Sequence, residues 1–87
     1  MTYGFTLYFE DVHEMTEAIA DALFGAGCDD STPFSRDGEA GAGFDRVAES
    51  LESAITTAVA DVRSAGLRVK RVTIDPADLP KAGSAGA

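Results

Sequence analysis

The sequence predicts an α+β domain on the split βαβ (ferredoxin-like) plan, which is an antiparallel four-stranded sheet with two helices on one face. One observation is the order of the predicted elements: strand, helix, strand, strand, helix, strand. Another is that residues able to block edge-to-edge pairing fall on the two strands that this plan places at the sheet edges. The third is length, because 87 residues suffice for one hydrophobic core. We therefore expect a single domain over residues 1–76 and a flexible C-terminal tail over residues 77–87.

The first predicted strand spans residues 3–9, where large apolar residues alternate with small or polar ones. This alternation is typical of a strand that is buried on one face only. The inward set is Tyr3, Phe5, Leu7 and Phe9, and the outward set is Gly4, Thr6 and Tyr8.

A helix is predicted next. Asp11 and Glu14 have the spacing of a capping box, which makes Asp11 the expected N-cap, with Thr16 as the alternative. Gly25 or Gly27 can adopt the left-handed conformation that ends a helix. The apolar residues at helical spacing are Met15, Ile19, Ala22, Leu23 and Ala26.

The middle of the chain predicts a hairpin. Residues 28–36 are compatible with a short strand, but Pro33 cannot donate a hydrogen bond to a neighbour, so the strand would lie at an edge. Asp37-Gly38 is a strong hairpin-turn signal. In the strand that follows, over residues 39–45, small residues would leave a thin spot in the sheet or allow another group close to the backbone. The shared face of that strand is Ala40, Ala42 and Phe44.

The second predicted helix begins after Ser50, a good N-cap, and ends at Gly66. Glu52 lies in its first turn, where the helix dipole favours a negative charge. We expect Ile55 and Val59 to be deeply buried against the first strand. The whole apolar stripe is Leu51, Ala54, Ile55, Ala58, Val59 and Val62.

The last predicted strand, residues 67–74, changes phase in its middle. Leu67 and Val69 have one parity, whereas Val72 and Ile74 have the other. A β-bulge near Lys70 would bring both pairs onto one face. Alternatively, Leu67 belongs to the preceding turn. Basic residues on this strand protect its edge; they are Arg68, Lys70 and Arg71.

The chain is strongly acidic, with 7 Lys and Arg against 15 Asp and Glu and a net charge of -8. Such a chain repels phosphate backbones, so we expect no direct nucleic-acid binding by this chain alone. A single cysteine cannot form an intramolecular disulfide, which favours a reducing, cytoplasmic location. No apolar run is long enough to cross a membrane, so no membrane association is expected.

The charges are unevenly distributed along the sequence. Arg36 is the first basic residue, whereas the segment from Arg63 to Arg71 carries four. One interpretation is an acidic surface that covers a basic partner, as in an inhibitor or antitoxin. The other is an ordinary solvated surface.

Three features of the sequence contain residue types that occur in chemical sites. Residues 10–14 gather three carboxylates and His13, but no second His or Cys stands at ligand spacing, so we expect no metal. Cys28 follows a helix C-terminus beside two acids, which raises a thiol pKa, so we expect a buried, unreactive side chain. The glycines of residues 38–43 lack the Lys and Ser/Thr of a phosphate-binding loop. We therefore expect a non-enzymatic protein without a cofactor, with a small-molecule- or metal-binding protein as an alternative.

The sheet face away from the helices is the predicted interaction surface, with Tyr8 as an isolated aromatic above glycine backbone. RNA-binding sheets of this plan place aromatic residues on both central strands, whereas the third strand here offers glycine. We therefore expect a weak homodimer or a protein partner through this face, with association that tightens as salt screens the repulsion between two acidic chains. The predicted interaction residues are Thr6, Tyr8, Gly41, Gly43 and Asp45.

Several short strings suggest a family. They are Phe5-Thr-Leu7, Ala22-Leu-Phe-Gly-Ala-Gly-Cys-Asp-Asp30, Phe44-Asp-Arg46, Ser50-Leu-Glu52, Ala54-Ile55, Asp61-Val62 and Arg71-Val-Thr-Ile-Asp-Pro76. Together, over residues 3–79, they resemble the N-terminal α/β domain of small bacterial helix-turn-helix DNA-binding proteins of uncertain function.

This resemblance implies an accessory module without active-site residues. In that family a Leu-rich helix-turn-helix follows, whereas here Pro80 and a Gly/Ala/Ser tail follow, and Gly41 and Gly43 replace aromatic and acidic residues. Direct DNA binding is therefore not implied for this chain. The expected function is a regulatory protein-interaction module, either part of a bacterial regulator or its stand-alone relative.

Overall fold

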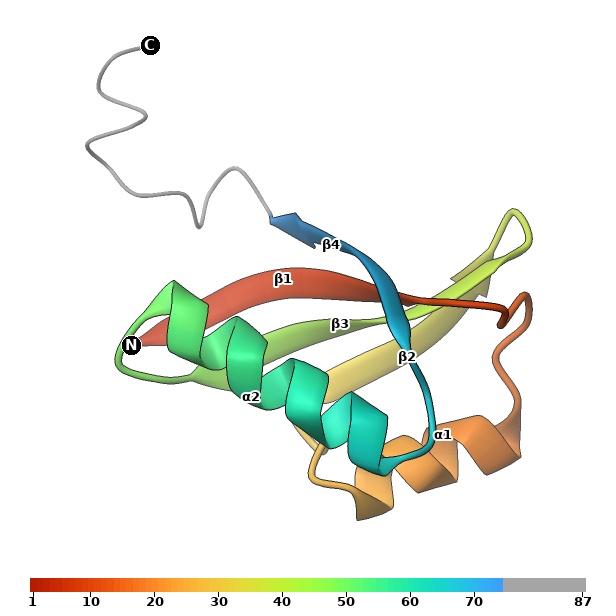
Figure 1. Cartoon of the computed structure of the whole chain (residues 1–87), viewed down its shortest axis with the longest axis horizontal. Helices are drawn as coiled ribbons and strands as arrows, with labels where there is room; N and C mark the ends of the chain where they lie inside the picture. The colour runs from red at the N-terminus through yellow and green to blue at the C-terminus, as the bar shows by residue number, and fades with distance from the viewer. Residues whose placement is uncertain (75–87) are drawn as a thin grey trace, which may run out of the picture.

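Strands and helices follow one another in the predicted order (Figure 1). The structure is a computed structural model that describes residues 1–74. The predicted tail over residues 77–87 and the predicted turn or helix start at Asp75-Pro76 lie outside these residues. The elements are β1 (Thr2–Phe9), α1 (Glu17–Gly25), β2 (Ser31–Arg36), β3 (Glu39–Val47), α2 (Leu51–Ser64) and β4 (Val69–Ile74).

The four strands form one antiparallel sheet in the order β2-β3-β1-β4. The first and third strands are therefore central and the other two are edges, as the sequence predicted. Pro33 lies within the edge strand β2, the kind of strand in which the sheet tolerates a proline.

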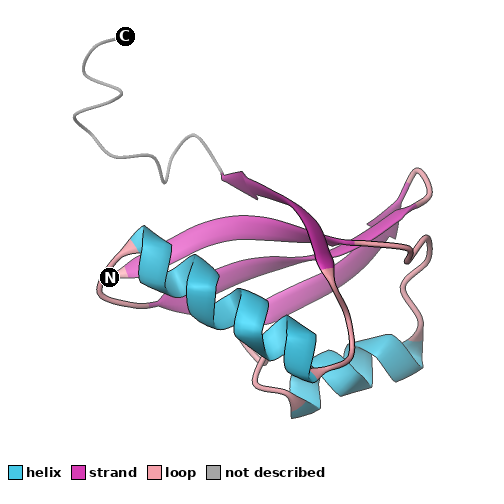
Figure 2. Ribbon diagram, viewed as in Figure 1, coloured by secondary structure: helices cyan, strands magenta, loops and turns pink. Residues whose placement is uncertain are grey.

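Both helices cover the same face of the sheet (Figure 2). The alternation in β1 and β3 turns one set of side chains toward them, and the rings of Phe5 and Phe44 stack there with centroids 5.4 Å apart. The buried apolar residues are Phe5, Leu7, Phe9, Leu23, Cys28, Ala40, Ala42, Phe44, Ala54, Ala58 and Val62.

Helix α2 presents a narrower face to the sheet than predicted. Ala54, Ala58 and Val62 are fully buried, whereas Ile55 and Val59 are only partly buried. The expectation that Ile55 and Val59 lie deepest is wrong. Residues four apart share a helix face, and the next residue along is rotated by about 100°, so these two side chains lie on the flank of the helix. Alanine on the inner face allows close packing of helix against sheet.

Helix α1 begins later than the expected capping box. Thr16 is the N-cap, and its hydroxyl accepts a hydrogen bond of 3.2 Å from the Ile19 N–H. Asp11 has φ 60° and lies in a left-handed turn, so the expectation that it caps the helix is wrong. The intervening loop is instead held to the β2–β3 hairpin, because the Ala40 N–H donates to the Val12 carbonyl.

Helix α1 ends as predicted, but its buried face is narrower than the predicted apolar stripe. Gly27, with φ +107°, provides the left-handed stop that one of two glycines was expected to provide. Leu23 is fully buried, but Ala22 of the predicted stripe is exposed. Phe24 is 68% exposed and is an aromatic side chain on the outer surface of this helix.

The predicted bulge in the last strand is present. Tyr8 pairs with Arg71 and Phe9 pairs with Val69, so Lys70 is the additional residue. Val69 and Val72 consequently both pack against the core. Leu67 lies in the turn before β4, where its N–H donates to a carbonyl at the end of α2.

The predicted hairpin turn is also confirmed. Asp37 and Gly38 have φ angles of 55° and 76°, the positive values that a two-residue hairpin turn of this kind requires. The turn sets Arg36 opposite Glu39 and thereby fixes the register between β2 and β3.

Candidate functional site

The sheet face opposite the helices, which we call the open face, consists of rows of side chains that cross the strands. Directly paired residues in a sheet project to the same side, so the pairing register gives each row. The aromatic row is Phe34, Gly41, Tyr8 and Arg71, on β2, β3, β1 and β4 in turn. The small row beside it is Thr32, Gly43, Thr6 and Thr73.

The aromatic row contains a pair of rings, and a cation lies at each side of this pair. The rings of Tyr8 and Phe34 meet edge to face, with centroids 5.7 Å apart. The guanidinium of Arg71 lies 4.0 Å from the Tyr8 centroid, and that of Arg36 lies 5.8 Å from the Phe34 centroid. Contacts of this type contribute about 0.5–1 kcal/mol each at exposed sites. The expectation that Tyr8 is an isolated aromatic is therefore wrong.

Gly41 makes this arrangement possible. A Cβ atom at this position would lie 2.5 Å from the Leu7 carbonyl oxygen and 3.1 Å from the Phe34 ring. The ring thus covers the bare backbone of the central strand, and Gly41 is buried. The sequence predicted a thin spot in the sheet at the small residues of this strand. At Gly41 the Phe34 side chain of the neighbouring strand β2 fills it.

Opposite charges lie at the two ends of the open face. Near the aromatic row, Glu39 binds Lys70 at 2.9 Å and Arg71 at 3.1 Å. The hydrogen bond from Arg71, and to a smaller extent that from Lys70, lowers the pKa of Glu39 to about 2. Arg36 has no ion-pair partner within residues 1–74, and neither does Asp45, which is exposed beyond the small row. One end therefore carries excess positive charge and the other a free carboxylate.

The structure brings all five residues of the predicted interaction face to this surface. Thr6 pairs with Gly43 and Tyr8 with Gly41, while Asp45 lies opposite Gly4. Phe34, Arg36 and Arg71 also lie on this surface, although the sequence did not predict them there. The signal for Phe34 was available, because a two-residue turn at 37–38 places residue 34 opposite residue 41.

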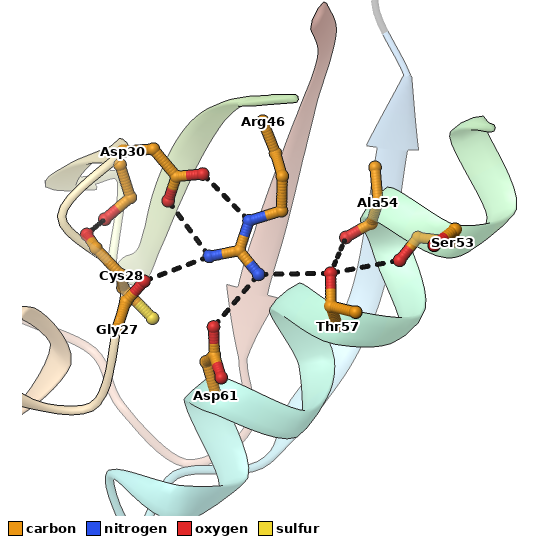
Figure 3. A network of polar contacts seen from close by, with 9 residues as sticks. Gly27, Cys28, Asp30, Arg46, Ser53, Ala54, Thr57 and Asp61 are labelled. Carbon is orange, nitrogen blue, oxygen red and sulfur yellow. Dashed lines mark hydrogen bonds and ion pairs between the residues drawn. The ribbon is translucent and has the colours of Figure 1, made fainter. Parts of the chain in front are cut away.

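A second polar centre lies on the helix side and is built around Arg46 of β3 (Figure 3). Its guanidinium donates to both carboxylate oxygens of Asp30, at 2.8 and 3.0 Å, and to Asp61 of α2 at 2.9 Å. It also donates to the Thr57 hydroxyl at 3.2 Å and the Gly27 carbonyl at 3.1 Å. These five hydrogen bonds account for all five N–H groups of the side chain.

The Arg46 centre is therefore a framework and not a ligand site, because no donor remains for a bound group. It joins β3 to α2 and to the loop between α1 and β2. The hydrogen bond from Arg46 lowers the pKa of Asp30. This role was not predicted from the sequence, because a charged side chain is usually assigned to the solvent side of a strand, although Arg46 has the parity of Phe44.

Cys28 is 2% exposed, and burial raises its pKa to about 11, with Asp61 adding to the effect. The predicted burial is confirmed. Because the thiolate is the reactive form, we expect a thiol reagent at neutral pH to modify the folded protein at least about tenfold more slowly than the unfolded protein. Stopped-flow kinetics with and without denaturant measures this ratio. Equal rates in the two states would contradict it.

The acidic segment over residues 10–14 does not converge on one point. Glu10 and Asp11 both lie near Arg68, at 3.9 and 3.6 Å, and the His13 ring faces the Gly38 carbonyl at 3.0 Å. Within residues 1–74 no three His, Cys, Asp or Glu side chains are grouped to hold a metal ion. Part of the acidic charge of the N-terminal half is thus paired with basic residues of the same chain.

A shallow pocket of about 290 Å³ lies between the end of α2 and β4. This volume is at the low end for ligand sites, and none of its lining residues is a buried polar group. The lining residues are Glu10, Val59, Arg63, Arg68 and Val69. We assign no ligand to this pocket.

None of the helices in the part of the chain that the structure describes has the length and apolar character needed to cross a membrane. Comparison of the chain with protein-family models, with curated proteins and with solved structures found no match. The resemblance to the N-terminal domain of bacterial helix-turn-helix proteins stays a prediction.

Proposed function

We propose that this chain is a non-enzymatic protein-interaction module of the ferredoxin-like plan, regulatory in character, which docks a protein on its open face. The strand order β2-β3-β1-β4 supports the ferredoxin-like assignment, because it is the order that the plan requires. A single cysteine in a buried position suits a cytoplasmic location.

The observation that carries the proposal is the aromatic row. Tyrosine and arginine are among the side chains most enriched at the energetic centres of protein interfaces. Here Tyr8 and Phe34 are held by each other and by two guanidinium groups, so little side-chain freedom is lost on binding. The row lies across all four strands and is not covered by either helix.

The test compares two aromatic surfaces. Tyr8→Glu places a charge in the aromatic row, and Phe24→Glu places the same charge on the exposed outer surface of α1. We expect Tyr8→Glu to weaken binding to the chain's own copies or to a purified host partner at least about tenfold, because a carboxylate replaces an anchoring ring. Phe24→Glu is expected to leave binding within about twofold. Binding is measured by calorimetry or sedimentation, after circular dichroism has shown that each variant is folded.

The opposite pattern, with loss of binding in Phe24→Glu and retention in Tyr8→Glu, would move the docking surface to α1. Retention of binding in both variants would remove the open face from the proposal.

A further inference from the structure

We propose that the open face binds a second copy of this chain, about a two-fold axis that lies between the two sheets and at right angles to their strands. The inference rests on the proposed function and names its partner. It is carried by the shapes of the rows and by the charges at the two ends of the face.

The aromatic row and the small row complement each other. The aromatic row is raised by the rings of Tyr8 and Phe34 and by Arg71, whereas the small row presents only threonine and glycine. The Leu7–Ala42 pair lies midway between the two rows. A two-fold axis at the level of this pair places the aromatic row of each copy on the small row of the other. Both contacts are then the same, as a symmetric dimer requires.

The same axis also brings opposite charges of the two copies together. Arg36 is opposite Glu39, three residues from Ala42 on one side, and Asp45 is three residues from Ala42 on the other. The axis therefore places Arg36 of one copy at the level of Asp45 of the other. The two residues are on adjacent strands, about 4.8 Å apart in projection, which is within reach of an arginine side chain. Neither has an ion-pair partner within residues 1–74.

The expected dimer is weak. The face from the level of Glu39 to that of Asp45 measures roughly 20 Å by 20 Å, or about 400 Å² per copy. The total of about 800 Å² is below the ~1,200–2,000 Å² of a standard stable interface. Two chains of net charge -8 also repel each other at long range. Since the Debye length is about 8 Å at 0.15 M salt, that repulsion is screened there while the direct Arg36–Asp45 contact persists. Association should therefore tighten from low salt to about 0.15 M.

The test is a charge exchange, measured by sedimentation equilibrium at about 0.15 M NaCl. In Arg36→Glu alone, or in Asp45→Arg alone, both symmetric contacts pair like charges. In a heterodimer of one copy of each variant, both contacts pair opposite charges again. Arg63→Glu is the matched control for Arg36→Glu, because it makes the same change of net charge on α2, away from the open face.

We expect each of the two variants to raise the dimer Kd at least about tenfold, and their equimolar mixture to return it to within about threefold of the wild-type value. Arg63→Glu should leave the Kd within about twofold. A mixture that binds no more tightly than the single variants would overturn the proposed pairing.

A wild-type chain that stays monomeric up to about 1 mM would overturn the second copy as the partner. If Tyr8→Glu still weakened binding to a purified host partner in that case, the proposed function would stand with a different protein on the open face. If it did not, both proposals would fail.

Discussion

Replacing Arg46 with alanine is expected to lower the free energy of unfolding by about 3 kcal/mol. The substitution removes five hydrogen bonds and leaves Asp30 and Asp61 without their cation. The value is at the lower end of the range for a broken buried ion pair, because the two carboxylates are 28% and 32% exposed and can still be hydrated. Urea denaturation measures the change. Arg63→Ala is the control, since this exposed arginine has no ion pair within residues 1–74, and we expect a change within about 0.5 kcal/mol.

The pH dependence of the free energy of unfolding gives a second test of the Arg46 centre. Arg46 lowers the pKa of Asp30 in the folded state below its ordinary value of 3.8. The stability that this pair contributes is therefore present above pH 3.8 and is lost as the pH falls through the lowered folded value. The difference in stability between wild type and Arg46→Ala should accordingly shrink between about pH 5 and pH 2. Two results would show that Arg46 does not stabilise the packing of the helices on the sheet. One is a loss of stability in Arg46→Ala no larger than that in Arg63→Ala, and the other is a stability difference from wild type that grows as the pH falls.

Replacing Gly41 with alanine is expected to destabilise the domain by about 2–3 kcal/mol. The new methyl group would lie 2.5 Å from the Leu7 carbonyl oxygen, which belongs to the central strand and cannot move without breaking the β1–β3 pairing. It would also press on the Phe34 ring at 3.1 Å, so the aromatic row should be displaced as well.

Gly43→Ala is the matched control two residues along the same strand. A Cβ at that position meets only the Thr6 hydroxyl at 4.0 Å, so there is room for it. The reduced freedom of the unfolded chain should make this variant neutral or stabilising by up to about 1 kcal/mol. Thermal and urea denaturation of the two variants measure the contrast. Equal stability would mean that the close approach at Gly41 is absent in solution.

Much of the fold could be predicted from short-range patterns. The alternation over residues 3–9, the Asp37-Gly38 turn and the cap at Ser50 each depend on neighbouring residues only, and all three appear as expected. The phase change around Lys70 even located the bulge. These signals act within a strand, a turn or a helix end, so no tertiary information is needed to interpret them.

The remaining features depend on contacts between distant segments. The expected helix start at Asp11 was wrong because the loop is held by a hydrogen bond to the β2–β3 hairpin, which local capping rules do not include. Arg46 was missed because its partners, Asp30 and Asp61, come from two other elements. Phe34 was missed because its side of the sheet depends on the register with β3.

The charged groups on the two sides of the sheet have different roles. On the helix side, Arg46 has every donor engaged and stabilises the packing of α2 and the α1–β2 loop on the sheet. On the open face, Arg36 and Asp45 carry charges without an ion-pair partner in residues 1–74, beside a ring pair that is held in place. We therefore place binding on the face where two charged groups, Arg36 and Asp45, have no ion-pair partner within residues 1–74.

Amide shifts in a dilution series test the central claim, docking on the open face, most directly. Heteronuclear NMR spectra of the wild-type chain are recorded from about 1 mM to about 20 µM, a range that spans a weak dimer. We predict that the amides which shift with concentration belong to the small row and its neighbours, with the shifts of Thr6 and Gly43 among the largest. The amides of Ala22 and Phe24 on α1 should stay constant. Shifts confined to α1, or to the α2 surface around Arg63, would contradict it.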